Sequence, residues 1–414
     1  MPQTNLRNII TRLLPDAERF LCDLIRFPST PGQEKKAMDC AFETFRKLGL
    51  TVEKIPLSDA IKSDPDYSDP IPDISYDGRY NLRITLPGNA GGKRLLFNTH
   101  MDVVPPSGGM TDAWTPRVKD GAVFGRGACD AKGQVALLYL IFKALKESAA
   151  QPAGDLVAHV VVEEENGGNG TLAMARTGER ADACIVLEPS DGKLFASIRG
   201  AVWFRLVFTG LAGHSGQAGS TRSALLMARD AIAILEKYHA DLLAASRGLP
   251  LFDPFPNPMP ITFGKLEAGN WPAAAPSRAV LEGVLGLLPN KTREQVCEGM
   301  RQALAQGTSE AFMKNTALSF MYRHDSSVTD PNHALPQAIL QTARQTGVPL
   351  EISAMTASCD AWLYNNQLNI PTVVCGAGTL KVAHSKDEHL ALKDLASTAE
   401  LLAAFAVNNS PLIN

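Results

Sequence analysis

The sequence predicts an α/β protein with a second, α+β domain inserted into its chain. Apolar strands alternate with helical stretches over residues 1–196 and again over residues 329–414, which is typical of an α/β domain. Between these segments, residues 197–328 show the order β-α-β-β-α-β of a ferredoxin-like sandwich. A chain of 414 residues is also long enough for more than one domain.

The overall composition is that of a soluble globular protein, with 45% apolar and 20% charged residues. A net charge of −3 gives no basis for a nucleic-acid or anionic-membrane partner. No apolar run reaches the roughly 18 residues that span a bilayer, and residues 1–26 predict an amphipathic helix rather than a signal peptide. Seven cysteines without a Cys-x-x-Cys spacing favour reduced thiols and a cytoplasmic location.

Apolar periodicity and its breakers define the elements of the first segment. Helices are expected over residues 17–25, 34–48 and 134–145, and strands over residues 51–55, 81–86, 94–99, 155–162 and 183–187. Pro28 separates the first two helices, and Gly49 is placed to end the second. Residues 58–78 are rich in Asp, Pro and Ser, so we expect a solvated loop there.

The remaining elements follow from the same patterns. Residues 201–208 place apolar side chains at every second position, as an antiparallel strand with one buried face does. Further strands are expected over residues 260–266, 279–288, 317–322, 351–354 and 371–375, and helices over residues 223–243, 292–305, 335–345 and 392–407.

A histidine and an aspartate stand together after the strand at residues 94–99. Residues two apart on a strand face the same side, so Asp102 is placed to accept the second ring N–H of His100. A metal-binding imidazole needs such a partner. On its own, this pattern is more often a surface pair, so the interpretation depends on the residues downstream.

Three further stretches supply carboxylates. The glycine-rich loop at residues 125–133 leads into a helix, but Asp130 makes it a better site for a cation than for a phosphate. Three consecutive glutamates, residues 163–165, directly follow a buried strand, and Glu188 follows the next one. A bound cation would offset their mutual repulsion, and ligands gather at the carboxyl ends of strands in α/β sheets.

The candidate ligands in chain order are His100, Asp130, either Glu164 or Glu165, Glu188 and His384. Two imidazoles and several carboxylates, without cysteine, suit zinc, cobalt or manganese. The set is too large for one tetrahedral ion, so one carboxylate bridges two ions or one acts as a base. A hydrolase with two metal ions satisfies both conditions.

Six segments together resemble a known enzyme family. They are THMDVVP (residues 99–105), GRGACDAKG (125–133), VVEEENGGNGT (161–171), LEPS (187–190), GHSG (213–216) and AHSKDEH (383–389). In this order they resemble the dinuclear zinc family of acetylornithine deacetylase, succinyl-diaminopimelate desuccinylase, aminoacylase and the glutamate carboxypeptidases. The resemblance implies a three-layer α/β/α metallopeptidase catalytic domain, residues 1–196 and 329–414. Residues 197–328 would form a ferredoxin-like lid and dimerisation domain, the lid domain below.

The resemblance also implies a role for individual residues. The ligands of two divalent ions, zinc first and cobalt or manganese as alternatives, would be His100 and Glu188 on one ion, Glu165 and His384 on the other, and Asp130 between them. Glu164 would be the general base, taking the proton of the attacking water and passing it to the leaving amine. Asp102 would orient His100, and the peptide bond after Asp130 would be cis. His214 would reach across a homodimer and stabilise the oxyanion in the partner's site.

Departures from the family's pattern bear on the substrate. The lid turn at residues 273–276 and the strand end at residues 284–286 lack the expected arginine, and Trp362 stands where many members carry another. This counts against a second substrate carboxylate and favours an N-acyl amino acid deacylase of the acetylornithine deacetylase kind. A dipeptidase, a carboxypeptidase or a succinyl-diaminopimelate desuccinylase is the alternative.

Two alternative hypotheses place the protein in a different functional class. One is an inactive homologue with a binding or regulatory role, which the retention of Glu164 and every ligand opposes. The other is a serine hydrolase using Ser215, which Gln217 opposes because a nucleophile elbow has glycine there. We expect surface positions for Arg199, Arg222 and Arg278. The histidines that we interpret as structural or surface residues are His159, His239, His324, His333 and His389.

Overall fold

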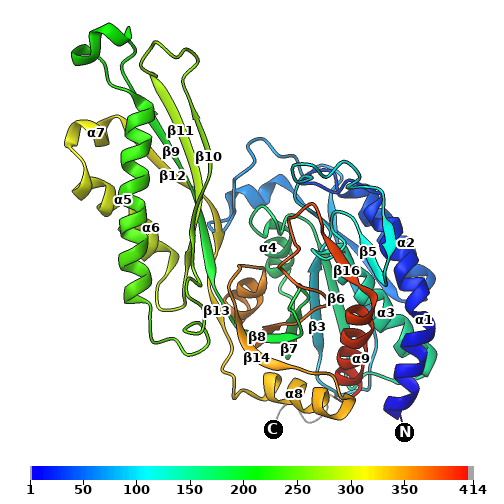
Figure 1. Cartoon of the computed structure of the whole chain (residues 1–414). Helices are drawn as coiled ribbons and strands as arrows, with labels where there is room; N and C mark the ends of the chain where they lie inside the picture. Colours follow the sequence, from blue (N-terminus) through cyan, green and yellow to red (C-terminus); the bar gives the residue numbers. More distant parts are fainter. Residues whose placement is uncertain (1, 409–414) are drawn as a thin grey trace.

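The computed structural model describes residues 2–408; the side chains of residues 2–4, 215, 217 and 218 lie outside the described part. The first catalytic segment contains α1 (Pro2–Ile25), α2 (Lys35–Lys47), β1 (Thr51–Pro56), the 3-10 helix η1 (Asp59–Ser63), β2 (Tyr80–Leu86), β3 (Leu95–His100), β4 (Arg117–Lys119), β5 (Ala122–Phe124), α3 (Lys132–Ser148), β6 (Leu156–Val161), α4 (Asn169–Arg176), β7 (Ala183–Val186) and β8 (Lys193–Ile198). The last segment contains β13 (Ser327–Val328), α8 (Ala334–Thr346), β14 (Glu351–Met355), the π-helix η3 (Leu363–Gln367), β15 (Thr372–Val374), β16 (His389–Ala391) and α9 (Leu392–Asn408). The two segments form one domain (Figure 1).

The catalytic domain is built on a nine-stranded mixed sheet with the order β1-β2-β6-β3-β7-β15-β8-β13, and β14 pairs with β8. Both faces of its central strands are covered. Phe97 and Ala158 pack into the core that contains α1, α3 and α9, whereas the neighbouring Asn98 and His159 hydrogen-bond to Tyr364 of η3 on the opposite face. The three-layer α/β/α arrangement that the sequence predicts is therefore confirmed.

The lid domain has the predicted ferredoxin-like order. It contains β9 (Gly200–Thr209), the 3-10 helix η2 (Ser215–Ser220), α5 (Ala224–Ala245), β10 (Ile261–Ala268), β11 (Arg278–Leu287), α6 (Arg293–Gly307), α7 (Glu310–Lys314) and β12 (Thr316–His324). The sheet is antiparallel with the order β10-β11-β9-β12. Phe204, Leu206 and Phe208 of β9 pack in one core with the apolar side chains of α5 and α6. Figure 1 shows both helices on the face of the sheet that is turned away from the catalytic domain.

One expectation for the catalytic domain is wrong. Residues 58–78 are not simply a solvated loop, because Asp66, Ser68 and Tyr76 are buried. The Tyr76 hydroxyl donates a hydrogen bond to Glu163 Oε2 at 2.6 Å, and Glu163 also pairs with the buried Arg79. The first of the three glutamates therefore anchors this loop and turns away from its two neighbours.

The apolar periodicity of the sequence also failed to predict several short strands and one helix. Strands β4, β5 and β16 form a separate three-stranded sheet, and each has only three residues, too few to show a period. Helix α4 begins at Asn169 in the glycine-rich stretch that follows the glutamates. Over residues 2–408, none of the helices is both long and apolar enough to cross a bilayer.

Candidate metal centre

Three parallel strands bring the first candidate ligands to one edge of the large sheet. In β3 and β6, His100 lies opposite Val161, and in β3 and β7, Asn98 lies opposite Val186. The chain positions that follow β6 and β7 therefore emerge beside His100 at the carboxyl ends of the strands. This register brings Glu164, Glu165 and Glu188 to the same place although up to 88 positions of sequence separate them from His100.

Asp130 reaches this edge from the loop that precedes α3. The peptide bond between Asp130 and Ala131 is cis, as the family resemblance implies. The backbone N–H groups of Cys129 and Asp130 both donate hydrogen bonds to Glu388 Oε1, at 3.1 Å each. Glu388 Oε2 accepts one from Arg126 Nη1 at 2.6 Å, and both partners of this ion pair are fully buried. The loop that carries Asp130 is thus fixed by a residue far along the chain.

The five predicted ligands converge around Asp130. His100 Nε2 lies 3.1 Å from Asp130 Oδ1 and 3.6 Å from Glu188 Oε1. His384 Nε2 lies 3.3 Å from Asp130 Oδ2 and 3.1 Å from Glu165 Oε1. The two carboxylate oxygens of Asp130 therefore face two different histidines, and each histidine has a second carboxylate beside it.

These separations fit ligands that share metal ions. Bond lengths of roughly 2.0–2.2 Å to nitrogen and oxygen place two ligands of a tetrahedral zinc ion about 3.3–3.5 Å apart. The observed values of 3.1–3.6 Å lie around that range, and His100, Asp130 and Glu165 form one group of mutually close ligand atoms. Nitrogen and carboxylate donors without sulfur also suit zinc, cobalt and manganese. The residues present therefore fit a pair of divalent cations.

Asp102 contacts His100 differently from what we expected. The ring Nδ1 of His100 lies 3.0 Å from the backbone carbonyl oxygen of Asp102 and 3.4 Å from its carboxylate. The carboxylate instead accepts hydrogen bonds from the backbone N–H groups of Glu164 and Glu165, at 3.2 and 3.0 Å. One residue therefore orients the histidine through its main chain and positions the glutamates through its side chain.

The charges in the site perturb one another strongly. Burial alone would lower the pKa of His384, but Asp130 and Glu165 raise it to about 11. Burial also opposes protonation of His100, yet Glu188, Asp102 and Asp130 raise its pKa well above the usual value. Burial raises the pKa of Glu188 to about 7, although His100 opposes the shift. Without metal, the site thus holds protons where cations would otherwise bind.

Glu164 lies close to the predicted ligands His100, Glu165 and Glu188, whose charges shift its pKa. It is 7% exposed, and burial raises its pKa well above the usual value. His100 lowers this pKa, whereas Glu188, Asp360 and Glu165 raise it. A carboxyl group with a raised pKa is suited to accept and return a proton near neutral pH. Its ligand atoms also lie within 4.8 Å of those of His324 and Asp360.

His214 lies away from this centre in the single chain. It is exposed and precedes η2, and its Nδ1 accepts a hydrogen bond from the Gly216 N–H at 3.1 Å. Its backbone pairs with Ala274. The segment η2 that follows it lies at the end of the lid domain that is far from the catalytic domain (Figure 1). The side chain of Ser215, the nucleophile of the serine-hydrolase alternative, lies outside the described residues.

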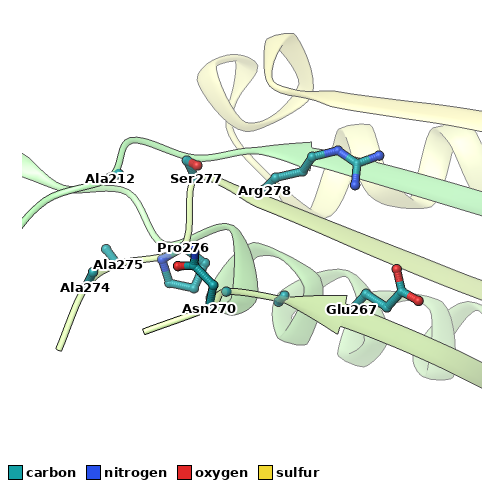
Figure 2. A pocket seen from close by; sticks show the side chains of 10 residues that line it. Ala212, Glu267, Asn270, Ala274, Ala275, Pro276, Ser277 and Arg278 are labelled. Carbon is teal, nitrogen blue, oxygen red and sulfur yellow. The ribbon is translucent and has the colours of Figure 1, made fainter. Parts of the chain in front are cut away.

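The lid turn whose sequence departs from the family's pattern borders a cavity of about 340 Å³ at this end. Figure 2 shows Ala274, Ala275 and Pro276 at its wall, with Arg278 and Glu267 on the strands that lead away.

The structure also shows the surroundings of two other residues named from the sequence. Trp362 is buried among apolar residues that include Leu172 and Leu363, and the Arg323 guanidinium lies 5.4 Å from its ring centre. Arg199 is not a surface residue: its guanidinium donates to the carbonyl oxygens of Thr356 and Gly200 at 2.6 and 3.0 Å, and burial lowers its pKa to about 10.

Sequence reasoning missed four residues that support the site: Arg126, His324, Asp360 and Glu388. His324, which was interpreted as a structural or surface residue, is fully buried at the end of β12. The predicted strand at residues 317–322 stops short of it. Extending that strand by two residues, which places Tyr322 and His324 on one face, was the available signal. Arg126 and Glu388 each lie in a segment that already contains a candidate ligand, which was the only signal for them.

The fold and the site define a metal-dependent hydrolase that acts on linear amides. The sequence profile of the peptidase family M20/M25/M40 matches residues 96–408, and the chain belongs to this family. The family resemblance inferred from the six segments is thereby confirmed. Members of the family use divalent metal ions, typically two.

Several relatives that are similar to this chain carry the names of different hydrolases. A succinyl-diaminopimelate desuccinylase of Rhodospirillum centenum is 26% identical over 92% of this chain and 94% of its own length. A probable carboxypeptidase of Aspergillus terreus is 29% identical over 69% of this chain and 64% of its own length. An N-formyl-4-amino-5-aminomethyl-2-methylpyrimidine deformylase of Bacillus subtilis is 26% identical over 80% of this chain and 84% of its own length.

Solved structures share the fold at low sequence identity. The di-peptidase Dug1p of Saccharomyces cerevisiae superposes with a TM-score of 0.81 at 15% identity, covering 99% of this chain and 98% of that one. Human carnosine dipeptidase 1 gives a TM-score of 0.78 at 15% identity, covering 99% and 100%. Both likenesses extend over the catalytic and the lid domains together.

Proposed function

We propose that the protein hydrolyses the amide bond of a small N-acyl amino acid with two divalent cations, zinc first among them. His100 and Glu188 would hold one ion, Glu165 and His384 the other, and Asp130 both. The observation that carries this proposal is the position of Asp130, whose two oxygens lie 3.1 and 3.3 Å from different imidazoles. A single ion could be coordinated by only one of these two histidines and its neighbouring carboxylate, and the other pair would have no ion to bind.

When bound, the cations supply Lewis acidity toward the amide carbonyl and lower the pKa of the attacking water. Glu164 accepts the proton of that water, because it is a buried carboxylate next to the ligand Glu165 and is not itself needed as a ligand. The same carboxyl group then delivers the proton to the leaving amine. Asp102 holds Glu164 and Glu165 in place through their backbone N–H groups.

Two observations weigh on the substrate class in opposite directions. The lid turn at residues 273–276 lacks arginine and Trp362 is buried in an apolar cluster, which favours substrates without a second carboxylate. The names of the relatives weigh toward desuccinylase or carboxypeptidase chemistry. We keep the N-acyl amino acid as the proposed class, with a succinylated substrate or a dipeptide as the second candidate.

The lid domain is proposed to form a homodimer and to supply His214 to the partner's site. Large apolar side chains are exposed on this domain, among them Leu211, Leu226 and Trp271, which are 54%, 50% and 68% exposed. Exposed apolar groups of this size favour a protein partner. An imidazole that stabilises a developing oxyanion contributes on the order of 3–4 kcal/mol to catalysis.

The test is a hydrolysis screen of the metal-loaded protein. N-acetyl, N-formyl and N-succinyl amino acids and dipeptides are compared before and after removal of metal with a chelator. The proposal expects turnover of one N-acyl class, its loss with the chelator and its return with zinc or cobalt. Glu164→Gln should lower turnover by at least a thousandfold and keep both ions. Full activity of this variant would refute the assignment of the base.

The same screen addresses the two other readings. An inactive homologue would hydrolyse none of these substrates while still binding metal. A serine hydrolase using Ser215 would keep its activity in the chelator and lose it in Ser215→Ala.

A further inference from the structure

A second group of ligand-type side chains lies beside the proposed metal centre. Ligand atoms of Glu164, His324 and Asp360 lie within 4.8 Å of one another, and all three residues are buried. His324 is the last residue of β12 in the lid domain, whereas Asp360 follows β14 in the catalytic domain. The group, called the Glu164 cluster below, therefore contains residues from both domains.

Two atoms of the Glu164 cluster have no hydrogen-bond partner within the described chain, residues 2–408: His324 Nε2 and Asp360 Oδ1. Both residues are fully buried, and buried polar atoms are paired as a rule. The two atoms lie 3.4 Å apart. This exceeds the roughly 2.7–3.2 Å of an N–H···O bond, but it equals the separation of about 3.3–3.5 Å between two ligands of one zinc ion.

The other polar atoms of the same two side chains are held as they are in metal sites. His324 Nδ1 hydrogen-bonds to the Tyr322 hydroxyl at 2.8 Å. Asp360 Oδ2 accepts a hydrogen bond from the Thr171 hydroxyl at 2.6 Å. Metal-binding imidazoles and carboxylates regularly have such partners, which aim the free atom at the ion. His100 shows the same pattern with the carbonyl of Asp102.

Gly168 keeps the space between the two free atoms accessible. A Cβ atom at this position would come within 2.4 Å of Asp360 Oδ1 and 2.9 Å of His324 Nε2. Any larger residue would therefore crowd both free atoms.

We propose that Glu164, His324 and Asp360 form a third, inhibitory site for a divalent cation, with zinc as the matching ion. One imidazole and two carboxylates are ligands that zinc accepts. The inference rests on the proposed function, since Glu164 is the general base there. A carboxylate that coordinates a cation cannot accept the proton of the attacking water, so an ion at this site stops turnover while the two other ions stay bound.

The test starts from protein loaded with two zinc ions per chain. Zinc chloride is added while binding is measured by calorimetry and hydrolysis by product release. The site predicts that a third ion binds and that activity falls with the same midpoint. In His324→Gln, the midpoint of both curves should rise at least tenfold while the first two ions remain bound.

Two further variants test the site even if His324→Gln folds poorly. Tyr322→Phe keeps the ring and removes only the hydroxyl that orients His324, so the midpoint should rise by a smaller factor. His333→Asn is the matched control, because it removes an exposed histidine and keeps a side chain that can cap α8. Its zinc response should equal that of the unmodified protein.

The outcomes separate this site from the proposed function. If no substrate in the screen is turned over, the proposed function fails, yet a third zinc ion that requires His324 still supports the site. If the protein hydrolyses substrate but binds only two ions, the site is refuted and the function stands. A third ion that binds His324→Gln as tightly as the unmodified protein also refutes the site.

Discussion

Asp102 and Glu165 are joined by a hydrogen bond of 3.0 Å in which the Asp102 carboxylate accepts the backbone N–H of Glu165. The other oxygen of the same carboxylate accepts the N–H of Glu164. From the sequence, we expected the Asp102 carboxylate to orient His100. It instead holds Glu164, the proposed base, and Glu165, a proposed ligand.

Asp102→Asn is expected to lower both metal affinity and kcat by about 10- to 100-fold. Asparagine has one acceptor oxygen, so one of the two N–H groups loses its partner while the size of the side chain is kept. Metal content after dialysis and steady-state kinetics measure the effect. Asp112→Asn, which removes an exposed carboxylate paired with Arg117, is the control. Unchanged metal binding in Asp102→Asn would contradict the positioning role.

Glu388→Gln is expected to destabilise the protein by about 3–5 kcal/mol, because Arg126 would be left as a buried charge without its counterion. Thermal or urea unfolding measures this loss. Adding Arg126→Met should restore much of the stability, since the unpaired charge is then absent. If the single variant unfolds like the unmodified protein, the buried pair does not hold the Asp130 loop.

Zinc binding is expected to release protons at pH 7, at least one of them from His384. Asp130 and Glu165 raise the pKa of His384 to about 11 against the effect of burial, and the pKa of His100 is also raised. His384 of the metal-free protein therefore carries a proton at pH 7, the shift at His100 favours a second, and a cation must displace such protons. A higher pH removes this competition, so affinity should rise with pH. Calorimetry in buffers of different ionisation enthalpy counts the protons, and a count near zero would contradict protonated imidazoles.

Mixing two inactive variants tests the proposed trans role of His214. In a heterodimer of Glu164→Gln and His214→Ala, one site has both an intact Glu164 and a partner with an intact His214. Subunit exchange should therefore restore up to about a quarter of the unmodified activity, if half of the dimers are mixed and one of their two sites works. Size-exclusion chromatography checks the dimer. Absence of any recovery in a verified mixed dimer would place His214 in its own subunit's site, and full activity of His214→Ala alone would place it outside catalysis.

The parts of the fold that repeat a period were predictable from the sequence. Strand β6 is apolar except for His159, β3 begins with three apolar residues, and β9 alternates, so their positions could be inferred. His100 and Glu188 were proposed as ligands because each stands at or just beyond the end of a predicted strand.

Contacts between distant segments were not predictable in this way. Glu388 and Arg126 are 262 positions apart, and no local sequence pattern predicts that these two charged side chains form a buried ion pair. The same holds for Tyr76 and Glu163, which turn a polar loop into part of the interior. Charged and polar residues are exposed by default, and only the assembled fold decides which of them are paired inside.

The most direct test of the central claim is a crystal structure of the protein loaded with two zinc ions per chain, with anomalous scattering measured at the zinc absorption edge. The account predicts two strong peaks on either side of the Asp130 carboxylate, one in contact with His100 and Glu188 and the other with Glu165 and His384. A single peak, or peaks that do not touch Asp130, would contradict it.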